Sequence, residues 1–381
     1  MENQNNVTEF VFVGLWENKK IELLFFFLFL LCYLAILMGN SIIFLTITCS
    51  HLIRQPMYYF LCHLSLMDLC YTSAVVPRLI RDLAAARKNI SYNNCMTQLF
   101  TAHLLAGVEI CILVSMAFDR YVAIVKPLHY VAIMSRQRCN MLVVLAWAVG
   151  FWHSVALLLM VLSLPFCGPN QIDHYLCDVK PLLKLVCKDI HVVSILVIAN
   201  SGMVVVVIFL VLVVSYILIL CNLRTRSSAG RRKALSTCSS HIMVVALFFV
   251  PCIYTHVLRA GAENRDKGVS VFYTVIAPML NPLICTLRNM EMNVAMRKDF
   301  CWTKPTTGDP EVIDCIVPEW HASAGERNRI RVPVDFIPEI NLPLLPPPPP
   351  SPEVLLFGFL NIMTVVSYKL LMMLMLVLMY L

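Results

Sequence analysis

The sequence has little charge for its length. Of its 381 residues, 14% are charged and 59% are hydrophobic. Soluble domains average about 25% charged and about 45–50% apolar residues. The shortage of charge therefore excludes an ordinary soluble domain and indicates a membrane protein.

Patterns typical of catalysis are missing as well. The sequence has no metal-ligand cluster, nucleotide-binding loop or nucleophile elbow, so we expect neither an enzyme nor a nucleic-acid-binding protein. It also lacks an internal repeat and a matched pair of broken spans, which a transporter would favour. A transporter or channel is kept as an alternative because of an extra apolar run and two acids in the membrane.

The first 22 residues lack the short apolar core and cleavage site of a removable signal peptide. We expect residues 1–22 to form an extracellular N-terminus and the first span to target the chain to the membrane.

What the sequence does contain is a series of apolar runs. About 20 helical residues cross a bilayer core of about 30 Å. Seven runs of suitable length are predicted at 23–49, 57–80, 98–121, 141–164, 191–221, 236–258 and 268–288. The fold class is therefore an all-α membrane protein with a seven-transmembrane helix bundle, and an eighth hydrophobic helix at 354–381 would follow it.

Charge, sequons and cysteines give the same orientation. Segment 222–235 holds five basic residues and no acid, which predicts a cytoplasmic loop and an external N-terminus. Glycosylation sequons at Asn6 and Asn89 then lie outside. Four of the 16 cysteines also fall in external segments, where disulfides persist, and spacing alone leaves three pairings open: Cys95, Cys167, Cys177 and Cys187.

Two acids lie near the middle of predicted spans. A charge at mid-bilayer costs roughly 2.5–3.5 kcal/mol, so Asp68 and Glu109 are functional candidates. Two carboxylates at similar depth repel unless one is protonated or a cation lies between them. We predict a cation site, and the alternative is a neutral polar cluster with Asn40 and Asn281.

The stretch SMAFDRYVAIVKPLHY, 115–130, places Asp119, Arg120 and Tyr121 at the inner end of the third span. Arg120 can extend toward the cytoplasm or pair with Asp119. An exchange of that partner would make a switch, and a simple interfacial anchor is the alternative.

Six ordered motifs resemble those of vertebrate olfactory receptors, which are rhodopsin-like G-protein-coupled receptors. They are GN at 39–40, PMYYFLCHLSLMD at 56–68, MAFDRYVAIVKPLHY at 116–130, SY at 215–216, KALSTCSSH at 233–241 and PMLNPLICTLRN at 278–289. The external loop LPFCGPNQIDHYLCDVKPLLKLVC at 164–187 is similar too. The resemblance covers about residues 5–300, and 23–300 would be the receptor domain with a short amphipathic helix at its end.

This resemblance implies a plasma-membrane receptor that couples small volatile odorants to a stimulatory, olfactory-type G protein and cyclic AMP. It implies disulfides between Cys95 and Cys177 and between Cys167 and Cys187. It also places Asp119, Arg120, Tyr121, Tyr216, Asn281, Pro282 and Cys285 in the activation switch, and makes Asp68 and Glu109 a sodium-linked polar centre. We expect no cofactor apart from this sodium ion.

Residues that resemble the family's odorant pocket follow helical spacing in the third and sixth spans. They are His103, Ala106, Gly107, Ile110, Phe249, Cys252, Ile253 and His256, with Asn200, Ser201 and Thr274 on adjoining walls.

The chain departs from the family's pattern at Phe249, where the family commonly has tyrosine, at Cys285 and after Phe300. Cys285 stands where the family usually has tyrosine, and a thiol is a weak donor that cannot replace a phenol. After Phe300, residues 301–353 read as a disordered proline-rich linker before the apolar run 354–381. This tail is either an eighth helix or a product of altered splicing or an incorrect gene model. A non-signalling or poorly trafficked variant is therefore an alternative function.

Overall fold

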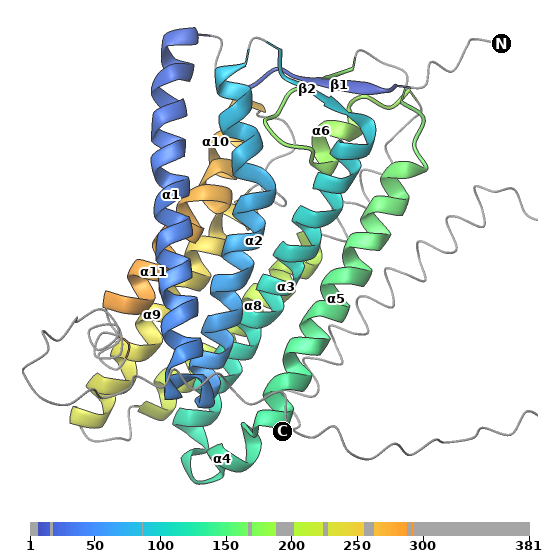
Figure 1. Ribbon diagram of the computed structural model, residues 1–381. Coiled ribbons are helices and arrows are strands. Elements are labelled where there is room, and N and C mark those ends of the chain that lie inside the picture. Colours follow the sequence, from blue (N-terminus) through green and yellow to red (C-terminus); the bar gives the residue numbers. More distant parts are fainter. Residues whose placement is uncertain are drawn as a thin grey trace, which may run out of the picture.

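The structure, a computed structural model, is a bundle of long helices capped at one end by a small sheet (Figure 1). It describes residues 7–15, 18–85, 87–166, 170–187, 202–223, 228–254, 263–287 and 292. The expected 301–353 linker, the 354–381 run and the short amphipathic helix before them lie outside these residues.

The first four long helices match predicted spans and extend most of them. They are α1 (Lys19–Cys49), α2 (Pro56–Ala84), α3 (Tyr92–Val125) and α5 (Arg136–Leu162). Polar caps extend the starts of α1 and α3 beyond the apolar runs, because the Asn18 side chain accepts a hydrogen bond from Lys20 N and Ser91 accepts one from Asn94 N. Short turns join them at the lower end, namely η1 (His51–Arg54), η2 (Pro127–His129) and α4 (Tyr130–Ile133).

The remaining part of the bundle consists of α8 (Met203–Leu223), α9 (Ser228–Ile253) and a broken seventh span. That span runs through α10 (Glu263–Val271), the π-helix η5 (Phe272–Ile276) and α11 (Ala277–Leu287). The predicted loop 222–235 is shorter than expected, since α9 already begins at Ser228. Within the described residues, six helices are long and apolar enough to cross a membrane, and Cys238–Ile253 of α9 is a shorter apolar stretch.

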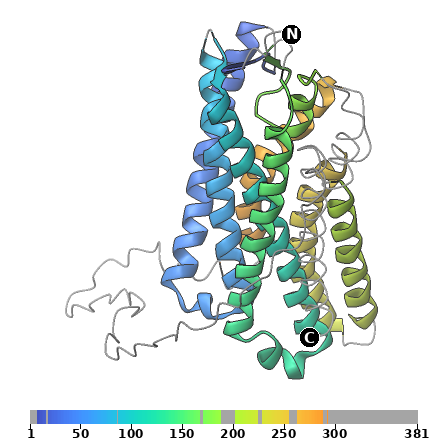
Figure 2. The ribbon, with the colours of Figure 1, turned by 90° about the vertical axis from the view of Figure 1, so that its right-hand side faces the viewer.

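Helices α3 and α5 are in close contact at a pair of glycines. A Cβ built on Gly150 would lie 2.8 Å from Leu104 O, and one on Gly107 would lie 3.0 Å from the Gly150 Cα. Small residues at such crossings allow helix backbones to pack directly. In Figure 2 the two helices run side by side along the bundle.

The upper end carries a three-stranded sheet that the sequence did not predict. Strand β1 (Glu9–Phe12) lies between β2 (Asn89–Ser91), to which it is antiparallel, and β3 (Gln171–Ile172), to which it is parallel. Residues of the strands, of the upper ends of α3 and α5, and of the short helix α6 (Val179–Leu183) form a second hydrophobic core, separate from that of the bundle.

Candidate ligand-binding site and switch

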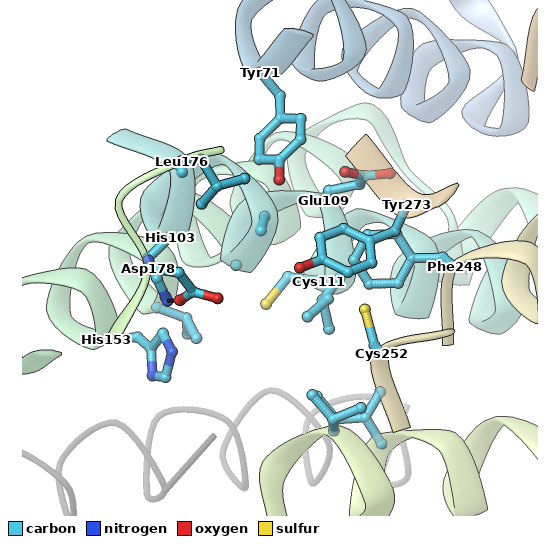
Figure 3. Close-up of a pocket in the computed structure, with 17 residues that line it drawn as sticks. Tyr71, His103, Glu109, Cys111, His153, Leu176, Asp178, Phe248, Cys252 and Tyr273 are labelled. Atoms are coloured by element: carbon cyan, nitrogen blue, oxygen red, sulfur yellow. Dashed lines mark ion pairs between the residues drawn. The ribbon is translucent and has the colours of Figure 1, made fainter. Parts of the chain in front are cut away.

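A pocket lies inside the bundle below the external loop (Figure 3). Side chains from α2, α3, α5, α8, α9, η5 and the loop before α6 line it. The lining residues are Tyr71, Ala102, His103, Ala106, Gly107, Glu109, Ile110, Cys111, Val149, His153, Leu176, Asp178, Val205, Ile208, Phe248, Cys252 and Tyr273. Such a mostly apolar cavity with a few polar groups is typical of small-molecule sites.

The α3 residues predicted for this pocket all line it, namely His103, Ala106, Gly107 and Ile110. On α9 the predicted Cys252 lines the pocket, whereas the predicted Phe249 is 0% exposed and packs against Phe209 and Phe248. Its neighbour Phe248 lines the pocket instead, because one residue turns a helix face by about 100°.

Two further predicted positions lie beside the pocket without lining it. Ile253 packs against the bundle core. Thr274 is fully buried and donates to Ser270 O, and it accepts a hydrogen bond of 2.9 Å from the Tyr175 hydroxyl. Asn200, Ser201 and His256 lie outside the described residues.

An imidazole and a carboxylate face each other at one end of the pocket. His103 Nε2 lies 3.7 Å from Asp178 Oδ1. His103 Nδ1 is 2.9 Å from Leu99 O, and since a carbonyl only accepts, Nδ1 carries the proton. Asp178 also caps α6 by accepting from Val179 N at 2.7 Å. Each side chain of the pair is therefore fixed by a hydrogen bond to a backbone group, His103 by Leu99 O and Asp178 by Val179 N.

The predicted polar centre lies deeper in the bundle. Asp68 is 1% exposed and accepts two hydrogen bonds, at 3.0 and 3.3 Å, from the Asn281 amide. Glu109 is 5% exposed, interacts electrostatically with Asp68 and also lines the pocket. Asn40 does not join this group, because its amide donates to the backbone oxygens of Ile36 and Pro278.

The lower end of α3 holds the predicted ion pair. Arg120 Nη2 lies 2.8 Å from Asp119 Oδ2, and the Tyr130 hydroxyl donates to Asp119 Oδ1 at 2.8 Å. Burial, followed by the Asp119 carboxylate, raises the pKa of Tyr130, so this phenol keeps its proton and remains a donor. Arg120 therefore pairs with its neighbour, as one of the two predicted arrangements has it, and Tyr121 is half-buried against the core.

Tyr216 is buried and shares a hydrogen bond with His241 Nδ1, a residue the sequence analysis did not select. Its position in the motif KALSTCSSH was the available signal. Asn281 and Pro282 lie in α11, where Pro282 is close to Gly39 of α1. Cys285 lies in the same helix, and its side chain is outside the described ones.

A disulfide joins Cys95 at the upper end of α3 to Cys177 in the loop. Cys187 is disulfide-bonded as well, whereas Cys167 lies outside the described residues. Of the two sequons, Asn6 is likewise outside, and Asn89 is exposed in β2 with its amide donating to Glu9 Oε2 at 3.1 Å.

Sequence reasoning missed several pocket residues, among them Asp178, His153, Leu176, Tyr71 and Tyr273. Asp178 and Leu176 flank Cys177, so the disulfide that holds the loop against α3 also brings them over the cavity. Proximity to a bridged cysteine was the only sequence signal for them.

Comparison with known proteins gives a consistent picture. A family model described as olfactory receptor matches residues 29–302. The chain is 52% identical to Olfactory receptor 4B13 of Mus musculus over 297 residues, and this alignment covers 78% of this chain and 97% of that protein. It is 51% identical over 298 residues to Olfactory receptor 4S2 of Homo sapiens, with 78% and 96% covered. The family match extends from within α1 to beyond α11.

Proposed function

Because the chain belongs to the olfactory receptor family, we propose that it binds small volatile organic molecules and signals through a stimulatory-type G protein to cyclic AMP. The family assignment makes it a non-enzymatic, multi-pass membrane receptor with odorant ligands and G-protein partners. The volatile ligand class, the type of G protein, the plasma-membrane location and the extracellular N-terminus belong to the proposal.

The observation that carries the proposal is the position of the pocket along the bundle. Its upper wall includes Leu176 and Asp178, which flank the disulfide-bonded Cys177, and its lower part reaches Glu109. Glu109 interacts with Asp68, which is bonded to Asn281 of α11. A ligand in this pocket therefore contacts a chain of buried polar residues that links α3, α2 and the seventh span.

A signal can reach the lower end by population shift. A ligand that binds one helix arrangement better than another moves the equilibrium by its differential affinity. The pairs Arg120–Asp119 and Tyr216–His241 are noncovalent contacts between groups that can change partners. We propose that separation of these pairs opens the cytoplasmic face to the G protein.

Sodium at the polar centre is part of this proposal. The residues fit such an ion, because a third oxygen lies near the two carboxylates. This is Asn281 Oδ1, which is buried and has no hydrogen-bond partner among the described residues. Hard cations prefer oxygen ligands of this kind. Asp68 and Glu109 would hold the ion and lose their mutual repulsion.

A second candidate, a chain that does not signal, is favoured by Cys285 in α11 and by the tail after Phe300. Cyclic AMP should be measured in cells that express a stimulatory olfactory-type G protein, with the full chain, a form ending at Phe300 and Cys285→Tyr, at matched surface levels. A dose-dependent response of any form to an odorant panel supports the receptor proposal. A response confined to the short form or to Cys285→Tyr supports the second candidate, and silence of all three forms overturns the proposed coupling.

A further inference from the structure

Tyr71 of α2 carries a hydrogen-bond donor that no described residue satisfies. Its side chain is 7% exposed and lines the pocket, and Figure 3 shows its hydroxyl directed into the cavity. A phenol is protonated at neutral pH and can donate one hydrogen bond. Within the described part of the chain, no group accepts that bond. Buried tyrosine hydroxyls usually have a partner, so the pocket offers a donor that the protein itself does not use.

Two nearby hydroxyl groups show the usual arrangement. Tyr273 lines the same cavity, and its hydroxyl donates to Ser270 Oγ at 3.2 Å. Thr72, which follows Tyr71 on α2, donates to Asp68 O at 2.6 Å. Both of these protons are used inside the protein. The unused donor is therefore a property of Tyr71 and not of every hydroxyl group in this region.

Glu109 is an obvious candidate for an internal acceptor, because it lines the same pocket and interacts electrostatically with Tyr71. The two side chains nevertheless form no hydrogen bond in the described structure. Glu109 interacts with Asp68 as well, on the side of the polar centre. The Tyr71 hydroxyl is thus left to face cavity space that a ligand atom can occupy.

The complement of an unused donor is a ligand with an accepting oxygen. The described lining contains no lysine or arginine that could pair with an anion. Burial of a charge without a partner is costly, so the accepting group should be uncharged. A carbonyl oxygen meets both requirements, because it accepts a hydrogen bond and brings no donor of its own that the pocket would have to satisfy.

We propose that Tyr71 donates a hydrogen bond to the carbonyl oxygen of neutral odorants, so that the pocket selects ketones, aldehydes and esters over hydrocarbons of the same shape. The inference rests on the proposed function and names its ligand class. Tyr71 follows Asp68 by three residues on α2, which corresponds to about 4.5 Å along the helix. The bound oxygen would therefore lie next to the polar centre, where Asp68 accepts two hydrogen bonds from Asn281 of the seventh span.

The test is a double-mutant cycle between the Tyr71 hydroxyl and the ligand oxygen. Acetophenone, cyclohexanone and acetylcyclohexane are compared with α-methylstyrene, methylenecyclohexane and isopropenylcyclohexane, in which a methylene group replaces the oxygen. Binding to the purified full chain in lipid nanodiscs is measured as ligand-induced thermal stabilisation, for the unchanged protein, Tyr71→Phe and Tyr273→Phe. Tyr273→Phe is the matched control, because it removes the same atom from the same pocket, but one whose proton Ser270 already accepts.

We expect Tyr71→Phe to reduce the ratio of ketone affinity to isostere affinity by about tenfold, the contribution of one hydrogen bond, and Tyr273→Phe to change it by less than about twofold. All proteins meet the ligands in the same nanodiscs, so partition of a ligand into lipid cancels from the comparison. The thermal midpoints of the ligand-free variants report separately on folding.

The outcomes separate the inference from the function on which it rests. A ratio that falls in Tyr71→Phe and persists in Tyr273→Phe supports the inference, even when cyclic AMP does not rise. Absence of ketone binding, a ratio that survives Tyr71→Phe, or an equal fall in both variants overturns it. Cyclic AMP responses to odorants whose potency does not depend on Tyr71 would uphold the receptor function and overturn the carbonyl assignment.

Discussion

The two ends of the helix bundle are held together by different kinds of interaction. The upper end has a disulfide, a three-stranded sheet, a hydrophobic core of its own and the ion pairs Lys88–Glu22 and Lys267–Asp173. At the lower end, the described polar contacts of the switch are the Arg120–Asp119 pair and two hydrogen bonds made by tyrosines. The upper end is therefore built to keep its shape and the lower end to change it.

This difference has a consequence for signalling. Ligand binding below the rigid cap is not expected to displace the upper ends of the helices, because the second core and the disulfide resist movement there. Rearrangement of the lower end requires less free energy, because the contacts there are noncovalent and each contributes on the order of 1–3 kcal/mol. Variants of the upper end should therefore change folding and surface amount, and variants of the lower end should change basal activity.

The largest effect is expected from Cys95→Ser. The disulfide joins residues 82 apart in sequence, and loss of such a loop closure costs about 4 kcal/mol. We expect almost no receptor at the cell surface, measured by antibody staining of an N-terminal tag on intact cells. Cys32→Ser, which changes a free cysteine of α1, is the control. Normal surface amounts of Cys95→Ser would show that the sheet and second core hold the cap without the covalent bond.

Phe10→Ala should have the next largest effect. Phe10 of β1 is 0% exposed and packs against Tyr92 and Phe166. Its truncation leaves a cavity that costs about 3 kcal/mol, so we expect a lower thermal midpoint of the purified protein. Val13→Ala, at a residue that is 47% exposed, should leave the midpoint unchanged. Equal midpoints for the two variants would mean that β1 does not contribute to the stability of the cap.

Tyr130→Phe tests the lower end. It removes the hydrogen bond to Asp119 Oδ1 and keeps the ring. A hydrogen bond to a carboxylate contributes about 1.5 kcal/mol, or about tenfold in an equilibrium constant. We expect basal cyclic AMP to rise by up to about tenfold, because Asp119 then holds Arg120 less firmly, while the thermal midpoint falls by less than in Phe10→Ala. A fall in midpoint like that of Phe10→Ala, without a change in basal signal, would contradict the contrast between the ends.

The lower end was the more predictable one from sequence. Asp119 and Arg120 are neighbours in the chain, so their pairing needs no knowledge of the fold. Spacing on α3 also grouped His103, Ala106, Gly107 and Ile110 on one side of a regular helix, and all four line the cavity. The seven-helix bundle followed from the lengths of the apolar runs and is confirmed.

The upper end was not predictable in the same way. Strand β1 has four residues, and its partners are far along the chain, with Glu9 opposite Ser91 and Val11 opposite Gln171. No local pattern specifies such pairings. On α9, the choice between Phe248 and Phe249 depended on how neighbouring helices fix its rotation, which apolar spacing does not determine.

The smallest effect, and the finest test of the cap, concerns His174. Burial lowers the pKa of this imidazole to about 4; the carboxylates of Asp178 and Asp173 oppose this shift, and the ammonium group of Lys267 adds to it. Its Nδ1 accepts a hydrogen bond of 3.2 Å from Leu176 N, which the unprotonated ring allows and the protonated ring does not. Leu176 lines the pocket, so this bond connects the proton state of the cap to the ligand site.

The sign of the pH effect follows from the two proton affinities. An unfolded histidine titrates near pH 6.5, so between about pH 6.5 and 4 the unfolded state binds more protons than the folded one, and stability falls with falling pH. Above pH 6.5 this contribution is constant. We expect exchange of the Leu176 amide hydrogen, measured after correction for the intrinsic pH dependence, to speed up as the pH drops through this window. His174→Asn, whose side-chain oxygen can accept the same bond, should abolish the change, and an unaltered pH profile in that variant would assign the effect to another group of the cap.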